Sequence, residues 1–220
     1  MKHEEDKAIV AFTDLQTNGV FELDAEAVLL ATGRRPNTKD LNLEVAGVET
    51  DARGAIIVDE YLKTTQPNIR AVGDVKGGLQ FTYISLDDYR IVREDLFGDK
   101  ERKTNDRNPV SYSVFIDPPL ARIGLNEEEA CKQNLDIIVK KLPAMAIPRA
   151  KTLGEMDGLL KAIIDKNTGK ILGCMLFAPD SGEVINTVAI AMKAGLDYTF
   201  LRDFIFTHPS MSEALNDLFS

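Results

Sequence analysis

The sequence predicts an α+β fold in which an antiparallel sheet with flanking helices on one face forms the second half of the chain. A polar segment, residues 98–108 (GDKERKTNDRN), separates this half from the first and indicates a domain boundary. After it, apolar side chains repeat at helical spacing from Glu183 to Ala194, and Gly195 ends the predicted helix. Four segments of this half have the composition of strands: residues 110–116, 137–141, 159–165 and 170–176. Residues 167–169 (NTG) join the last two as a predicted hairpin.

The first half of the chain begins with a predicted β-hairpin. Residues 8–12 and 20–23 have the alternation of antiparallel strands, and the Asn18-Gly19 pair between them is a strong turn signal. Residues 26–30 (EAVLL) predict a buried strand that leads into a loop at residues 31–37.

A second unit of the first half leads into a long helix. Residues 55–58 and 69–72 are apolar runs that predict strands, and residues 64–68 predict the turn between them. The second run ends in Gly73-Asp74. Residues 82–97 then place most of their apolar side chains at helical spacing.

Three shorter helices are expected in the second half. Asn126, with Glu129 three positions later, has the pattern of a capping box and opens the first of them. The other two are expected at residues 201–206 and 211–219.

The composition is that of a globular protein, with 44% hydrophobic and 28% charged residues over 220 positions. No apolar run reaches the length of a membrane span, and no basic segment followed by an apolar stretch opens the chain. We therefore expect a soluble, cytoplasmic protein with no membrane partner. The net charge of −9, with no cluster of Lys and Arg, argues against a nucleic-acid partner.

Neither cysteine is a good candidate for a nucleophile. Cys174 lies in an apolar run, which predicts a buried and inert thiol, and Cys131 follows an acidic triplet on a predicted helix. The two form no CxxC pair, and with only two histidines in the chain they do not make a zinc site. We expect a reducing compartment and no bound metal.

Four segments, taken in order, resemble motifs of the pyridine nucleotide–disulfide oxidoreductases, the family of glutathione reductase, dihydrolipoamide dehydrogenase and mercuric reductase. They are residues 31–37 (ATGRRPN), 64–74 (TTQPNIRAVGD), 114–125 (VFIDPPLARIGL) and 208–213 (HPSMSE). Each motif alone is weak to moderate evidence, but together their order and spacing are strong. The resemblance implies the C-terminal half of an enzyme that uses FAD and NAD(P).

The resemblance places cofactor contacts at the first two motifs and at the start of the following helix. Asp74 would stand at the carboxyl end of a buried strand, where its carboxylate can accept hydrogen bonds from ribityl hydroxyls, and Gly73 would let the cofactor approach the backbone. A Gly-Asp turn with no ligand is the alternative. Family members more often have Thr-Pro where this chain has Thr82-Tyr83. The remaining cofactor contacts that the resemblance implies are Ala31, Thr32, Gly33, Phe81 and Thr82.

His208 is the candidate catalytic residue, because a histidine titrates near neutrality and can exchange a proton with a thiol. A carboxylate on its second ring nitrogen would fix the tautomer, and Glu213 has the spacing that the family uses for this. Ser210 and Glu213 also form an S-x-x-E capping-box sequence, so Glu213 alternatively serves only the helix N-terminus. Glu183 matches another family position, and a role as partner of the helix dipole explains it equally well.

The resemblance also implies three domain segments. Residues 1–37 would end the nicotinamide domain, residues 38–107 would be the returning part of the FAD-binding α/β domain, and residues 108–220 would be the interface domain of a homodimer. In the family, the tail reaches the partner subunit's active site, so His208 would act across a two-fold axis. The GxGxxG turns and the CxxxxC pair of the family are absent from the sequence, so we expect a truncated product or an expressed fragment.

The functional hypothesis is the C-terminal portion of an FAD-dependent NAD(P)H oxidoreductase in cell redox homeostasis, with a disulfide or a metal ion as acceptor. This portion would supply the dimer interface and a His-Glu acid–base pair. The tail, residues 205–219, is similar to the reactive-chlorine-resistance flavoproteins, which implies a copper(II) reductase. The alternative is a catalytically inactive dimerisation module that binds no flavin, and this is the behaviour expected of the chain on its own.

Overall fold

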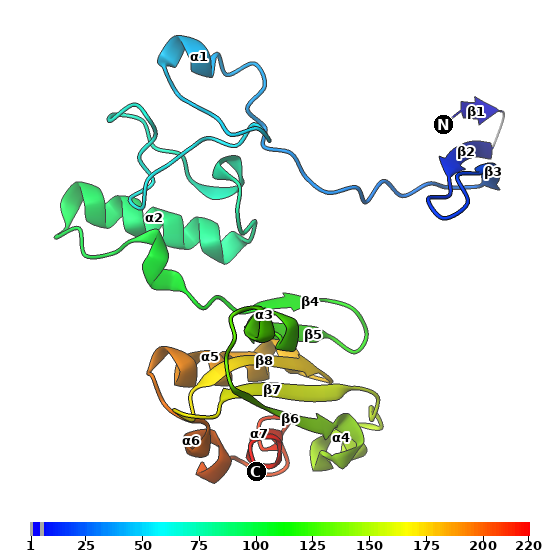
Figure 1. Cartoon of the computed structure of the whole chain (residues 1–220), viewed down its shortest axis with the longest axis vertical. Helices are drawn as coiled ribbons and strands as arrows, with labels where there is room; N and C mark the ends of the chain where they lie inside the picture. Colours follow the sequence, from blue (N-terminus) through cyan, green and yellow to red (C-terminus); the bar gives the residue numbers. More distant parts are fainter. Residues whose placement is uncertain (1, 5–6) are drawn as a thin grey trace. The chain divides into compact units, whose positions relative to one another are not determined.

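The computed structural model describes residues 2–4 and 7–220, and the chain divides into two compact units. Unit 1 comprises Met1–Thr104 and unit 2 comprises Asn105–Ser220. The division falls inside the polar segment 98–108 (green in Figure 1).

Unit 1 begins with an antiparallel sheet in the order β1-β2-β3 (Figure 1). Its strands are β1 (Lys2–Glu4), β2 (Lys7–Thr13) and β3 (Val20–Ala25). The predicted hairpin is confirmed: β2 and β3 pair from Ala8 with Ala25 to Thr13 with Val20. Asn18 has a φ of 53°, a left-handed conformation that asparagine tolerates in a tight turn. The sequence analysis did not predict β1.

The prediction of a buried strand at residues 26–30 is wrong. These residues have no regular secondary structure, and the side chains of Leu29 and Leu30 are 89% and 75% exposed. An apolar run becomes a buried strand only where neighbouring strands can pair with it and cover it. No strand in the described part of the chain pairs with this segment.

The prediction of strands at residues 55–58 and 69–72 is also wrong. Each segment makes only one isolated β-bridge, from Ile56 to Thr50 and from Arg70 to Lys63. The burial that the apolar runs indicated is nevertheless real, because Ile56 packs in a small cluster of buried residues with Val48 and Ala71. The turn at residues 64–68 forms as expected, closed by the Thr64 amide donating to the carbonyl of Ile69 at 3.0 Å.

The long helix α2 (Thr82–Phe97) is confirmed with the predicted bounds. The other helical elements of unit 1 are α1 (Leu43–Ala46), the 3-10 turn η1 (Gly73–Lys76) and η2 (Thr104–Arg107), which crosses the unit boundary. The buried face of α2 carries Ile84 and Ile91 together with the three carboxylates of Asp87, Asp88 and Asp95. Polar interactions therefore supplement the small apolar core of this unit.

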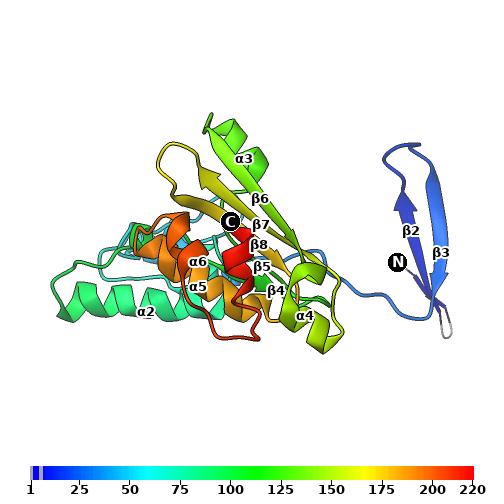
Figure 2. The ribbon, with the colours of Figure 1, turned by 90° about the horizontal axis from the view of Figure 1, so that it is seen from below.

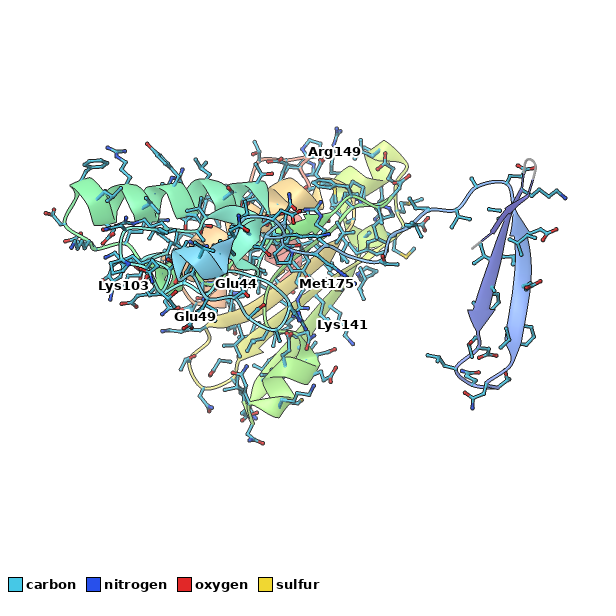
Figure 3. The ribbon with its side chains drawn as sticks, turned by 90° about the horizontal axis from the view of Figure 1, so that it is seen from above. Glu44, Glu49, Lys103, Lys141, Arg149 and Met175 are labelled. Atoms are coloured by element: carbon cyan, nitrogen blue, oxygen red, sulfur yellow. The ribbon has the colours of Figure 1, made fainter. Side chains whose placement is uncertain are left out.

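Three ion pairs show how loops of unit 1 are held. The Asp95 carboxylate, 1% exposed, binds Lys63 at 2.8 Å and also Arg70. Lys103, labelled in Figure 3, donates to Glu60 Oε1 at 2.7 Å, and this bond raises the pKa of the Lys103 ammonium.

Unit 2 is an antiparallel five-stranded sheet in the order β4-β5-β8-β7-β6 (Figure 1). Its strands are β4 (Tyr112–Val114), β5 (Leu120–Gly124), β6 (Ile137–Pro143), β7 (Leu159–Asp165) and β8 (Ile171–Phe177). The four predicted strands are present, although β4 is shorter than the predicted 110–116. Strand β5 was not predicted, because five residues directly after Pro118-Pro119 carry little strand signal.

The helices of unit 2 pack mainly on one face of this sheet. They are α3 (Glu127–Lys132), α4 (Pro148–Leu153), α5 (Ser181–Lys193), α6 (Tyr198–Asp203) and α7 (Ala214–Leu218), with a 3-10 turn η3 (Ala144–Ala146). Helix α5 contacts β5 and β8, and α7 contacts β6 and β7 (Figure 2). The predicted helix 201–206 begins three residues earlier and ends at Asp203, and the predicted helix 211–219 is limited to α7. Helix α4 was not predicted.

The two faces of the sheet differ in character because side chains alternate along each strand. The core face carries Ala121, Leu176 and Leu160 in register, all of them buried. On the other face, the register aligns Arg122, Met175, Lys161 and Lys141, of which Met175 and Lys141 are labelled in Figure 3. Glu127 of α3 lies 2.8 Å from Lys161 and 3.8 Å from Lys141, so α3 borders this charged face.

Candidate functional site

The tail of unit 2 is anchored by the apolar side of α7. Met211, Leu215 and Phe219 are at most 5% exposed and belong to the main core of the unit. The Asn216 amide nitrogen lies 2.9 Å from three carbonyl oxygens at the end of α6, those of residues 201, 202 and 204. Residues 207–213 are therefore presented by a well-packed helix. The sequence analysis missed the role of Asn216, for which no local pattern gives a signal.

The structure brings His208 and Glu213 into contact. Nδ1 of His208 lies 2.7 Å from Oε2 of Glu213, and the intervening His208–Pro209 peptide is cis. The His208 side chain is 69% exposed, whereas that of Glu213 is 16% exposed. Because a carboxylate accepts hydrogen bonds, Nδ1 carries the hydrogen and Nε2 is the ring nitrogen that remains for other chemistry.

Glu213 also makes the reciprocal bonds of a capping box with Ser210, but in the turn that precedes α7, whose N-cap residue is Glu213 itself. Its Oε1 accepts a hydrogen bond from the Ser210 amide at 3.2 Å, while the Glu213 amide donates to Oγ of Ser210 at 3.2 Å. Ser210 Oγ in turn donates to the carbonyl of Thr207 at 2.6 Å. One carboxylate oxygen serves the turn before α7 and the other serves His208.

The candidate flavin contacts lie in unit 1, around η1. Asp74 is the second residue of this 3-10 turn and does not end a strand, which corrects the prediction. Its side chain is 51% exposed and lies 3.4 Å from Nη1 of Arg34, which is 69% exposed. Gly73 is buried with a φ of 71°, and a Cβ there would lie 3.2 Å from Oγ of Ser85. Its glycine requirement is explained by this conformation and packing.

The other sequence-predicted contacts of unit 1 are accessible. Ala31, Thr32 and Gly33 are exposed in a segment without regular structure, and Arg34 joins this segment to η1 through Asp74. Phe81 precedes α2 as its N-cap residue, and Thr82 is the first residue of the helix.

An aromatic pair occupies the start of α2. The rings of Phe81 and Tyr83 stack with centroids 5.1 Å apart and planes inclined by 9°. Burial raises the pKa of Tyr83.

The two cysteines and Glu183 were also considered as functional residues in the sequence. Burial raises the pKa of Cys174 to about 12, which agrees with an inert thiol, and Cys131 is exposed on α3. Glu183 is exposed in the first turn of α5, where it favours the helix dipole. Among the residues that the structure describes, no group of three metal-ligating side chains is present. None of the described helices combines the length and apolar content needed to cross a membrane.

Comparison with known proteins gives the family. Residues 110–219 match the pyridine nucleotide-disulphide oxidoreductase dimerisation domain, and residues 2–88 match the pyridine nucleotide-disulphide oxidoreductase domain. The chain belongs to the pyridine nucleotide-disulphide oxidoreductases. This confirms the resemblance seen in the sequence motifs.

Individual relatives support the same assignment. The chain is 56% identical over 199 residues to the probable pyridine nucleotide-disulfide oxidoreductase RclA of Escherichia coli, covering 90% of this chain and 45% of that protein. It is 36% identical over 202 residues to mercuric reductase of Staphylococcus aureus, covering 91% and 37%. A solved structure described as a Cu(II) complex of the HOCl-induced flavoprotein disulfide reductase RclA from Escherichia coli matches with a TM-score of 0.92 and 52% identity, covering 99% and 48%. The chain thus spans about half the length of these relatives, or less.

Proposed function

We propose that the chain supplies the C-terminal portion of an FAD-dependent NAD(P)H oxidoreductase, with His208 and Glu213 as its acid–base pair. The observation that carries the proposal is the 2.7 Å contact between these two side chains in a member of this family. We assign residues 1–37, 38–107 and 108–220 to the end of the nicotinamide domain, the returning part of the FAD domain and a homodimer interface. The match to a dimerisation domain supports the last assignment. The proposed location is the cytoplasm.

The exposed groups of unit 1 fit the flavin cofactor. FAD, when bound, supplies electron transfer between NAD(P)H and the acceptor. The Asp74 carboxylate is half exposed and its ion pair with Arg34 is long, so it retains capacity to accept hydrogen bonds from ribityl hydroxyls. Residues 31–33 are exposed, and Phe81 and Thr82 begin α2; the proposal assigns these residues to contacts with the cofactors.

The chemistry assigned to unit 2 is proton transfer at one ring nitrogen. Glu213 holds the hydrogen on Nδ1 of His208, so Nε2 is free to take a proton from a thiol and to return it to a leaving thiolate. The carboxylate also stabilises the imidazolium that forms when Nε2 is protonated. The high exposure of His208 is consistent with a site that another polypeptide segment completes.

The acceptor class follows from the relatives. One relative is described as a flavoprotein disulfide reductase and has been solved as a Cu(II) complex, and another is a mercuric reductase. A disulfide or a metal ion is therefore the proposed electron acceptor, and cell redox homeostasis is the proposed role.

A fusion protein tests the proposal. The part of Escherichia coli RclA outside the matched segment would be placed ahead of this chain, and the isolated chain would serve as the control. We expect the fusion to bind visible flavin and to oxidise NADH or NADPH with a disulfide or Cu(II) as acceptor. A folded fusion without flavin, or with flavin and no turnover, would contradict the proposal.

The second candidate is a dimerisation module that binds no flavin, and the match of residues 110–219 favours it for the isolated chain. A colourless, dimeric chain without diaphorase activity supports this description of the chain alone. A yellow isolated chain that oxidises NAD(P)H contradicts it.

A further inference from the structure

Among the carboxylates on the buried face of α2, that of Asp88 binds η1. Its side chain is 0% exposed. Oδ2 of Asp88 accepts a hydrogen bond from the backbone amide of Gly73 at 2.8 Å and lies 3.4 Å from Nζ of Lys76. Asp95 binds the side chains of Lys63 and Arg70, and Asp87 binds that of Arg102, all of which lie outside η1. The Asp88 carboxylate is thus bound to both the backbone and a side chain of η1.

The two partners of Asp88 are the two ends of η1. Gly73 is the first residue of this turn and Lys76 is the last, so one carboxylate oxygen binds the turn on both sides of Asp74. The left-handed conformation of Gly73 and the nearby Oγ of Ser85 restrict the same end of the turn.

The Asp88–Lys76 pair is costly to bury, and apolar side chains in its place could contribute as much to the stability of the fold. The Lys76 side chain is only 9% exposed, so both charges have lost most of their hydration. Pairs of this kind often do no more than offset their own desolvation, and their best-supported advantage is that they select one arrangement of the groups they join. Here the group between the two partners is the backbone that carries Asp74.

We propose that Asp88 is a positioning residue that holds the Asp74 carboxylate in place to receive the ribityl hydroxyls of the flavin. This inference rests on the proposed function, because the position of Asp74 matters to the reaction only when flavin is bound. Asp88 does not contact the cofactor in this role. It acts through the Gly73 amide and the Lys76 ammonium.

The first test measures η1 in the chain itself by NMR. Asp88→Ala should speed exchange of the Gly73 amide about tenfold or more relative to the global opening rate, since a buried hydrogen bond to a charged group is lost. It should also move the carboxyl ¹³C signal of Asp74. Asp88→Asn, which keeps an oxygen for the Gly73 amide, should restore most of the protection.

Asp95→Asn is the matched control, because it alters a buried acid of the same helix that binds loop side chains outside η1. It should destabilise unit 1 while leaving Gly73 exchange, relative to global opening, and the Asp74 signal unchanged. If Asp88→Ala leaves both signals at their wild-type values, or if Asp95→Asn moves them equally, the inference is overturned. Should Asp88→Ala fail to fold, Lys76→Met gives the same test, with a shifted Asp74 signal and a protected Gly73 amide expected.

The second test measures FAD affinity in the fusion protein described above. Asp74→Ala and Asp88→Ala should each weaken FAD binding about tenfold, and the double variant should be little weaker than either, because both changes remove the same contact. Unchanged affinity in Asp74→Ala would refute the flavin contact while the exchange data still showed whether Asp88 holds the turn. Lost affinity in Asp74→Ala alone would refute the positioning role and leave the proposed function standing.

Discussion

The Ser210 hydroxyl and the Glu213 carboxylate make different contacts in the turn before α7, and two substitutions should separate their contributions to stability. Ser210→Ala removes the hydroxyl that accepts a hydrogen bond from the Glu213 amide and donates one to the Thr207 carbonyl. Each of these hydrogen bonds contributes about 0.5–1.5 kcal/mol net. We expect Ser210→Ala to lower the stability of unit 2 by about 1–2 kcal/mol, or about 4–8 °C in Tm for a unit of this size.

Glu213→Gln, in contrast, should lower the stability of unit 2 very little. Glutamine retains an oxygen for the Ser210 amide, as capping boxes allow, but presents no charge to His208. The stability loss should stay within about 0.5 kcal/mol, because the pair with a largely exposed His208 contributes little to folding. Urea unfolding followed by far-UV circular dichroism measures both effects in a chain without tryptophan. A stability loss in Glu213→Gln as large as that in Ser210→Ala would contradict the small contribution assigned to the His208–Glu213 pair.

Three further outcomes follow from the structure. Burial favours a raised pKa for Asp95, but hydrogen bonds from its two cations outweigh this effect and hold the pKa below its ordinary value. The stabilising contribution of Asp95 is therefore complete above about pH 4 and is lost as pH falls through the lowered folded-state pKa. Asp95→Asn should cost about 2 kcal/mol in urea unfolding at neutral pH, and it should flatten the fall of the unfolding free energy at acid pH. Gly173→Ala should cost about 3 kcal/mol of stability or prevent folding, since the new Cβ would lie 1.9 Å from a backbone oxygen. Gly195→Ala has open space around it and should cost only about 1 kcal/mol, from its positive φ. Thermal unfolding compares the two variants. In native buffer, a maleimide should label Cys131 and leave Cys174 unmodified until the chain unfolds, as mass spectrometry can show; rapid native labelling of Cys174 would contradict its burial.

Features set by short-range interactions were predictable from the sequence. Asn126 and Glu129 form the expected capping box, and Asn18 forms the expected turn of the β2–β3 hairpin, because each depends on residues only a few positions apart. The runs at 55–58 and 69–72 were misassigned because a strand also requires a neighbour that the local pattern does not specify.

The candidate site shows the same distinction. The sequence favoured the pair with His208 and left a purely capping role for Glu213 open, and in the structure different carboxylate oxygens contact His208 and the Ser210 amide. Asp88 was missed, although its spacing from Ile84 and Ile91 places it on the buried face of the predicted helix. A carboxylate at such a position is a signal, because burial of a charge requires a partner, but only the fold identifies that partner as the Gly73 amide.

The most direct test of the proposed function compares two rates in the fusion protein carrying His208→Ala. The first is the loss of flavin absorbance after NADH or NADPH is added, and the second is turnover with a disulfide acceptor. We expect the first rate to stay within about twofold of the unmutated fusion and the second to fall about 10²–10⁴-fold, because the proposal gives His208 the thiol proton and no part in flavin reduction. Disulfide turnover that is unchanged by His208→Ala would contradict the assignment of the acid–base pair.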